Sequence, residues 1–333
     1  MSEKTQKKND HFVIINGKLI EPGKPDSTLC NMLWEKGRIV GLGYLPEENE
    51  DDLHIFDASD CYILPPMIDL SSRFSLQTHH FQQAYGQGFR GLLYEQANTH
   101  YDHPQPYFFA MAHQLSSLNP SIHPNDLIVI NASDSQQDIQ HLFENATQQG
   151  ILLALEEDSS MTTLQTHINH FLQSQARHLH IGPIYNQDQL EYLHHLKKTQ
   201  SNISSFCQLE TCLKDPKLFF NGLKQGSLDT LSLGQNQNCI ALALPILLHL
   251  FKESNFDMLD FMHHLCISPL AVLNGGFQQI QLNASPPLII INPSKSPQFP
   301  SLKQSDKSKS ILPEGLTGAC VARIDQGILI EMR

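Results

Sequence analysis

The chain carries eighteen histidines among 333 residues, and several of them are closely spaced. Neutral imidazole is a common zinc ligand and can also transfer protons. The groups are His79-His80, His100/His103, His178/His180, His194-His195 and His263-His264. Adjacent histidines on a helix point about 100° apart, so such a pair seldom converges on one ion. We therefore interpret His194-His195 and His263-His264 as surface or half-buried residues, and His100/His103 remains the candidate with suitable ligand spacing.

Charged and amide side chains offer three further possibilities. Glu156-Glu157-Asp158 follows an apolar run and could bind a cation, although a solvated turn is the favoured interpretation. Arg73 could hold an anion, and we favour a salt bridge instead. Asn98 is interpreted as a turn residue rather than a ligand contact.

The segment at residues 62–76, YILPPMIDLSSRFSL, has the form of a strand end that presents chemistry. An apolar run, a proline pair and Met-Ile-Asp-Leu lead to the positions where a metallohydrolase would present His-x-His. Those positions are Ser71 and Arg73 here. A hydroxyl is a poor zinc ligand, and a guanidinium cannot lose its proton to become one. The segment thus predicts that the strand leading to such a metal site is present while the metal ligands are absent.

Composition limits the class of protein. Hydrophobic residues make up 40% and charged residues 17%, which predicts a folded chain with a large core. The net charge of −12 argues against nucleic acid and anionic membranes as main partners. No apolar run reaches membrane-spanning length, and the polar start has no secretory apolar region. The seven cysteines form no Cys-x-x-Cys, which indicates reduced, mostly buried thiols and a cytoplasmic location.

Both ends of the chain are rich in strand patterns. Strands are predicted at Phe12–Ile15, on both sides of the turn in Met32–Val40, at Leu53–Phe56 and at Tyr62–Leu70. Near the other end, Pro287–Pro293 reads as a strand and Ala319–Met332 as a hairpin. We expect a polar tail at 1–10 and one composite, sandwich-like β domain built from 11–63 and 280–333.

The middle of the chain, residues 64–279, alternates apolar strands with amphipathic helices. This alternation is typical of βα units around a parallel sheet. The predicted strands are Leu127–Asn131, Gly150–Leu155, His178–Gly182 and Leu228–Leu233. The predicted helices are Gln136–Gln149, Thr163–Ser174, Gln187–Lys198, Cys239–Phe251 and Met258–Leu265.

In the order of these segments the chain resembles the dihydroorotase branch of the amidohydrolase superfamily over nearly its whole length. The similar segments are 64–70, 150–158 with 161–164, 179–186, 220–230 and 267–274. Each segment is a weak match alone, and their shared order makes the resemblance specific. It implies an α/β fold: a degenerate (β/α)8 barrel of TIM type with a small composite β domain made from both termini.

The family's chemistry does not carry over to the matching positions. Its zinc-binding His-x-His matches Ser71 and Arg73, and its substrate arginine matches Ser75. A later ligand histidine matches Pro183, which has no donor atom. The catalytic aspartate and the histidine beside it match Gly234 and Gln235. Only Asn98-Thr99 resembles a retained substrate contact, after a shift of one residue.

The chain is also shorter than the family pattern. Between the helix ending near Ser174 and the strand at His178 there is only a short link, where the family has another strand and helix. A full barrel needs about 250 residues. We therefore leave open whether the barrel is complete.

Hydrolysis of a cyclic amide by this family's route needs a metal that generates hydroxide and a carboxylate that moves the proton. The substitutions predict a protein without catalytic residues, zinc or any other cofactor. The resemblance implies a non-catalytic dihydroorotase-like subunit in pyrimidine biosynthesis that scaffolds aspartate carbamoyltransferase in a mixed oligomer. Two alternatives stay open: an amidohydrolase with a relocated metal site, and a small-molecule sensor whose residual pocket includes Arg73 and Asn98.

Overall fold

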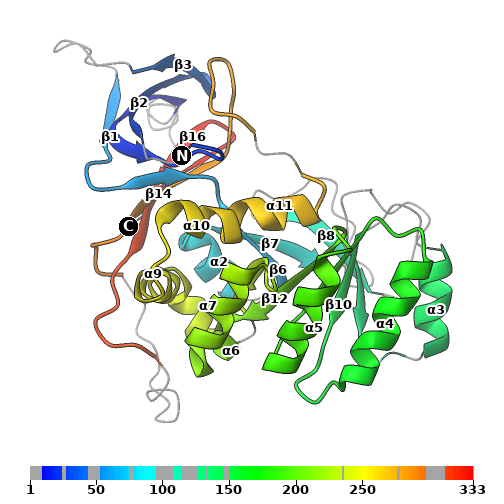
Figure 1. Cartoon of the computed structure of the whole chain (residues 1–333). Helices are drawn as coiled ribbons and strands as arrows, with labels where there is room; N and C mark the ends of the chain where they lie inside the picture. The colour runs from blue at the N-terminus through cyan, green and yellow to red at the C-terminus, as the bar shows by residue number, and fades with distance from the viewer. Residues whose placement is uncertain are drawn as a thin grey trace.

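The computed structural model places two β structures beside a layer of helices (Figure 1). It describes residues 10–24, 28–43, 53–74, 79–94, 108–114, 127–132, 134, 136–145, 150–234, 236–275, 278–297 and 312–332. One β structure is formed from both ends of the chain, and both termini lie beside it. The other is a parallel barrel sheet with helices packed along its outside.

The composite β sheet joins the two ends of the chain. Its strands are β1 (His11–Leu19), β2 (Thr28–Glu35), β3 (Arg38–Leu42), β4 (His54–Asp57), β5 (Tyr62–Leu64), β14 (Leu288–Asn292), β15 (Ala319–Asp325) and β16 (Ile328–Glu331). The order is β16-β15-β14-β5-β1-β2-β3, with β4 also paired to β1. The predicted run Tyr62–Leu70 is split by Pro65-Pro66, which lacks two backbone donors. A β domain made from both termini is thus confirmed, and its exact boundaries stay a prediction.

The barrel sheet contains eight strands in sequence order, and every paired neighbour is parallel. They are β6 (Met67–Phe74), β7 (Phe89–Tyr94), β8 (Phe108–Gln114), β9 (Leu127–Asn131), β10 (Gly150–Ala154), β11 (His178–Gly182), β12 (Ile203–Gln208) and β13 (Thr230–Ser232). The end strands β6 and β13 are linked by a hydrogen bond of 2.9 Å from Ser232 Oγ to Asp69 Oδ1.

The TIM-type α/β fold is confirmed, and the described residues form eight barrel strands. The short link after Ser174 does leave β10 paired directly with β11. The described sheet nevertheless has eight strands, because β7, β8 and β12 form in segments where no strand was predicted. Their sequences, FRGLLY, FFAMAHQ and ISSFCQ, lack the continuous β-branched runs that reveal a buried strand.

The helices lie between the strands and over the ends of the barrel. They are α2 (His79–Gly86), α3 (Gln136–Asn145), α4 (Met161–Gln173), α5 (Gln187–Lys197), α6 (Leu209–Lys214), α7 (Pro216–Gln225), α8 (Gln237–Ala241), α9 (Ala243–Glu253), α10 (Met258–Met262), the π-helix η2 (His263–Ile267) and α11 (Ser268–Val272). The helix expected over Cys239–Phe251 is thus two helices, and the one expected over Met258–Leu265 continues as π-helix. Cap side chains of Ser160, Asn186 and Asp215 fix the starts of α4, α5 and α7.

Alternate residues of the barrel strands face two separate cores. Outward residues such as Ile151 and Ile181 pack against the helices. Inward residues such as Leu127, Leu152 and Phe206 form a cluster with Leu270 of α11 and its neighbours Val272 and Leu273. Because Leu127 begins β9, α11 covers the N-terminal end of the barrel. The interior is therefore packed with side chains rather than open at that end.

A buried charged network joins the β domain to the barrel. Arg323 of β15 is fully buried, and its guanidinium lies 3.5 Å from the Tyr85 ring centre and donates to the Tyr85 carbonyl. Asp325 pairs with Arg90 of β7, and its other oxygen accepts from the Tyr85 hydroxyl and, at 3.3 Å, from Arg323 Nε. Planar guanidinium groups suit such shared, desolvated contacts.

Two expectations from composition can be compared with the structure. All seven cysteines are free thiols, and all but Cys30 are buried, as predicted. Among the residues that the structure describes, no helix has both the length and the apolar character needed to cross a membrane.

Candidate functional site

In parallel barrels, the carboxyl ends of the strands meet at one face, where catalytic residues are found. We call this face the mouth. Ser71 and Arg73 belong to the end of β6, whose backbone the structure describes, while Pro183 follows β11 and Gly234 follows β13. The structure thus brings four of the predicted positions to strand ends. Ser75, Gln235, Asn98, His100 and His103 lie outside the described residues.

The end of β11 leaves little space at the mouth. The Gly182-Pro183 peptide is cis, and both residues are buried. A Cβ atom on Gly182 would lie 2.7 Å from the Phe206 ring and closer still to the Phe206 carbonyl oxygen. That carbonyl accepts a hydrogen bond of 2.9 Å from Ile184 N. Phe206 therefore fills the interior directly beneath the strand end where the family carries a ligand histidine.

The end of β13 has a backbone shape that suits glycine. Gly234 has a φ of +74°, a left-handed conformation that costs other residues free energy. Its N–H donates to Ser232 Oγ at 3.3 Å, and Ser232 in turn donates to the buried Asp69. An aspartate at Gly234 would have to adopt this strained backbone before it could act as a base.

The rim beside β10 is acidic. Glu156, Glu157 and Asp158 are exposed, and Ser159 closes their turn by hydrogen bonds of 2.8 and 2.9 Å with Glu156. Across the rim, burial raises the pKa of Tyr185 to about 12, with smaller contributions from Glu157, Glu210 and Glu156. The geometry is that of a solvated turn.

The described mouth residues do not fit a catalytic zinc ion. Such a site needs three nitrogen or oxygen ligands converging on an open position. Pro183 and Gly234 supply no side-chain donor, and the Phe206 ring lies against the backbone at Gly182. Across the part of the chain that the structure describes, no group of three His, Cys, Asp or Glu side chains could hold a metal ion.

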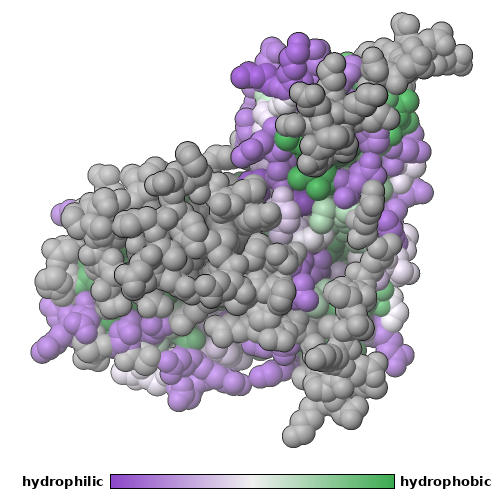
Figure 2. Space-filling model, turned by 180° about the vertical axis from the view of Figure 1, so that it is seen from behind, coloured by the Kyte–Doolittle hydropathy of each residue, from purple (hydrophilic) through white to green (hydrophobic). Residues whose placement is uncertain are grey.

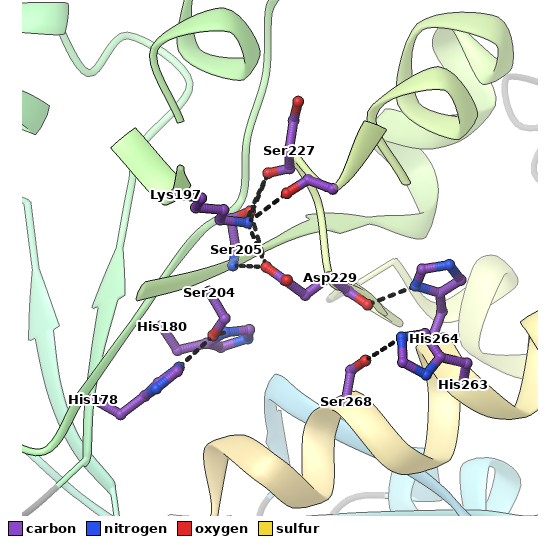
Figure 3. Close-up of polar contacts among 11 residues, drawn as sticks. His178, His180, Lys197, Ser204, Ser205, Ser227, Asp229, His263, His264 and Ser268 are labelled. Carbon is purple, nitrogen blue, oxygen red and sulfur yellow. Dashed lines mark hydrogen bonds and ion pairs between the residues drawn. The ribbon is translucent and has the colours of Figure 1, made fainter. Parts of the chain in front are cut away.

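A second polar group lies at the opposite end of the barrel (Figure 3). Lys197 ends α5, Ser205 lies near the start of β12, and Asp229 immediately precedes β13. Lys197 Nζ pairs with Asp229 and donates to Ser205 Oγ at 2.7 Å and to the Ser227 carbonyl at 2.9 Å. Burial lowers the pKa of Lys197, and Asp229 opposes that shift.

The histidines of β11 belong to the same end. Ser204 Oγ lies 2.7 Å from His178 Nε2 and 2.7 Å from His180 Nδ1. A hydroxyl has one proton, so it donates to one ring and accepts from the other. Burial, followed by the charge of Arg177, lowers the pKa of His178 to about 4, and burial holds the pKa of His180 well below its ordinary value. Both rings are therefore neutral near pH 7 and act as hydrogen-bonding core residues.

The remaining histidine pairs give a mixed result. His194 is half-buried and His195 exposed, as predicted. His263 is exposed, but His264 is buried, and its Nδ1 is hydrogen-bonded to the Asp229 carbonyl at 2.8 Å. The interpretation of His264 as a surface or half-buried residue was therefore wrong. The π-helix turns this ring inward, which a regular helical pattern does not predict.

Sequence reasoning missed this N-terminal group as a unit. Its members are separated along the chain, and only the parallel pairing of β11, β12 and β13 brings them together. A local signal exists in polar residues at strand starts, such as Ser204 and Ser205 in ISSFCQ. Polar residues at this end of a barrel stabilise the fold rather than catalyse. The deep burial of Ser205 and its bond of 2.5 Å to the Ser227 carbonyl agree with that role.

Comparison with protein-family models gives no match, and comparison with curated proteins gives none either. Solved structures do match. A dihydropyrimidinase from Brevibacillus agri has a TM-score of 0.71 and 11% identity, covering 96% of this chain and 95% of that one. The L-hydantoinase (dihydropyrimidinase) from Arthrobacter aurescens has a TM-score of 0.71 and 12% identity, covering 96% of each chain. A prolidase complexed with N-methylphosphonate-L-proline has a TM-score of 0.60 and 9% identity, covering 97% of this chain and all of that one.

These structural matches show the fold and not the activity. The fold of this chain, a parallel barrel sheet with an attached β domain, is similar to that of the matched dihydropyrimidinase, L-hydantoinase and prolidase structures. Membership of the amidohydrolase superfamily and of its dihydroorotase branch stays a prediction from the sequence resemblance.

Proposed function

We propose that this chain is a non-catalytic, dihydroorotase-like protein that serves as an assembly subunit of aspartate carbamoyltransferase. The observation that carries the proposal is the contrast between the strands of the barrel and the residues at its mouth. Eight parallel strands are kept, while the strand ends at Pro183 and Gly234 offer no metal ligand or base. Selection that acts only on shape and contacts would retain the strands and allow the metal ligands and the base to be lost.

The partner comes from the sequence resemblance, and surface composition supports a role in contacts. Of the described residues, large exposed hydrophobic side chains on the composite sheet include Leu29, Leu42 and Ile55, with exposed fractions of 68%, 44% and 49%. Figure 2 shows such hydrophobic patches amid hydrophilic surface on the β domain. Exposed apolar patches commonly mark protein contacts.

Co-purification tests the assembly role. We expect tag-free protein mixed with the aspartate carbamoyltransferase catalytic chain of the same organism to form a complex larger than the catalytic trimer, measured by light scattering after size exclusion. Leu29→Asp with Ile55→Asp should weaken the complex, while the matched exposed change Leu172→Asp on α4 should leave it intact. A catalytic chain that is equally active, stable and trimeric without this protein contradicts the proposal.

Metal analysis tests the alternative of a hydrolase with a relocated site. We expect cleaned, tag-free protein to contain far less than one zinc per chain and to show no turnover of dihydroorotate or hydantoin. One zinc per chain, lost together with activity in His100→Ala or His103→Ala, would establish the hydrolase instead.

A further inference from the structure

A cavity of about 750 Å³ lies where the composite β domain meets α9 and α10. One wall is α9 and the turn that follows it. The other is made by Tyr62 of β5, residues 293–294 after β14 and residues 315–317 before β15. Figure 1 shows these orange and red C-terminal segments running beside α9. Pockets of roughly 300–1,000 Å³ at domain junctions are typical small-molecule sites.

The inner surface of this cavity is aromatic. Phe251 and Phe261 are buried, and their rings are 5.1 Å apart at 65°. Phe256 packs edge-on against Phe251 at 5.4 Å and 71°, and Leu248 and Met258 complete the apolar lining. Ring edges and faces presented at such angles favour another flat ring over a flexible chain.

Lys252 places one positive charge at the rim of the cavity. Leu248, Phe251 and Lys252 recur at the helical spacing that places them on one face of α9, and Asn255 follows the end of that helix. No ion pair joins Lys252 to another residue that the structure describes, and His249 beside it adds an imidazole donor. These groups can meet an anion at the cavity entrance.

One carboxylate also lines the cavity, and the helix start engages it. Asp257 Oδ1 accepts hydrogen bonds from Leu259 N at 2.8 Å and Asp260 N at 2.9 Å, and the Asp257 N–H donates to Asp260 in a capping box. Asp257 Oδ1 is thus occupied by hydrogen bonds from the backbone of α10. Ser294 and Thr317 supply neutral hydroxyls on the opposite wall.

We propose that this cavity binds a small aromatic carboxylate. The aromatic lining would receive the ring, and Lys252 would receive one negative charge. A lysine is a point charge without the fork that suits bidentate phosphate recognition, and a single lysine matches a monoanion better than a phosphate dianion. The site lies away from the barrel mouth and is independent of the proposed assembly function.

Isothermal titration calorimetry with 1-naphthoate tests the site. We expect saturable binding of one molecule per chain, with 1-naphthalenemethanol, the uncharged analogue, binding at least tenfold more weakly. Lys252→Glu should weaken binding of 1-naphthoate at least tenfold. Thr317→Trp, which fills the cavity from an exposed position, should abolish it. Lys214→Glu makes the same charge change at an exposed position of α6, and this variant should bind 1-naphthoate as the unmodified protein does.

Unfolding temperatures of the three variants within a few degrees of the parent will show that each is folded. Absence of saturable 1:1 binding overturns the proposal, as does unchanged affinity in both Lys252→Glu and Thr317→Trp. Equal affinity for the acid and the alcohol overturns the assignment of the ligand as a carboxylate.

Discussion

The two ends of the barrel use their polar residues differently. At the C-terminal end, the strand ends at Gly182-Pro183 and Gly234 present backbone and no side-chain chemistry. At the N-terminal end, Lys197 and Asp229 form an ion pair surrounded by hydroxyls and carbonyls. An enzyme barrel concentrates its chemistry at the first end.

The difference lies in what each group of residues contributes to the fold. The N-terminal group satisfies its charges internally and stabilises the junction of α5, β12 and β13. The mouth instead has residues chosen for fit: Gly182 lies against Phe206, and Gly234 takes a turn that other residues resist. Four substitutions or conditions, in order of expected effect, test this difference.

The largest effect is expected at the N-terminal end. Lys197→Met leaves Asp229 without its cation, and breaking such a partly buried pair typically costs about 3–5 kcal/mol. Urea denaturation will measure the free energy of unfolding. The matched change Lys214→Met removes an exposed pair with Glu157, 3.3 Å apart, and should cost less than about 1 kcal/mol. Equal losses in the two variants would contradict a structural role for the N-terminal group.

Acid should weaken the same end. The pKa of His178 is about 4 in the folded protein and near 6.5 when unfolded, so the unfolded chain binds a proton that the folded chain does not. The free energy of unfolding should therefore fall as pH falls from 6.5 toward 4, by up to about 1.4 kcal/mol per pH unit for this histidine. His178→Gln should flatten the dependence, measured by urea denaturation at several pH values. The exposed change His195→Gln should leave the slope unaltered.

At the mouth, a single added methyl group tests the fit of β11. Gly182→Ala places a carbon 2.7 Å from the Phe206 ring and against its carbonyl, which should cost about 1–3 kcal/mol through overpacking. Gly86→Ala is the control, because its added carbon meets only Met332 at 3.8 Å. If Gly182→Ala is as stable as Gly86→Ala, the strand end has room for a side chain and the comparison fails.

The smallest effect is expected at Gly234. Gly234→Ala must keep a φ of +74°, which should cost about 1 kcal/mol in urea denaturation. Gly234→Asn should cost less, since asparagine tolerates this conformation better. Equal stability of all three proteins would show that the turn is free to change shape, and an aspartate base could then be restored there.

The identity and order of the residues are enough to establish which chemical groups are present and where the most periodic elements lie. Pro183 and Gly234 lack donor atoms in any fold, so a missing ligand could be inferred from identity alone. Apolar runs such as Leu127–Asn131 and Gly150–Ala154 became β9 and β10 because their burial pattern is local. The strand patterns at both ends also predicted one composite β domain.

Which distant residues meet depends on how the strands and helices are assembled. The strand ISSFCQ forms because β11 and β13 supply its hydrogen-bond partners, although its serines weaken any local signal. The same pairing carries Ser205 to Lys197 and Asp229. The inward turn of His264 likewise depends on a π-helix packed against β13. These contacts arise from the alignment of parallel strands and from packing between elements, and neither is encoded in the spacing of neighbouring residues.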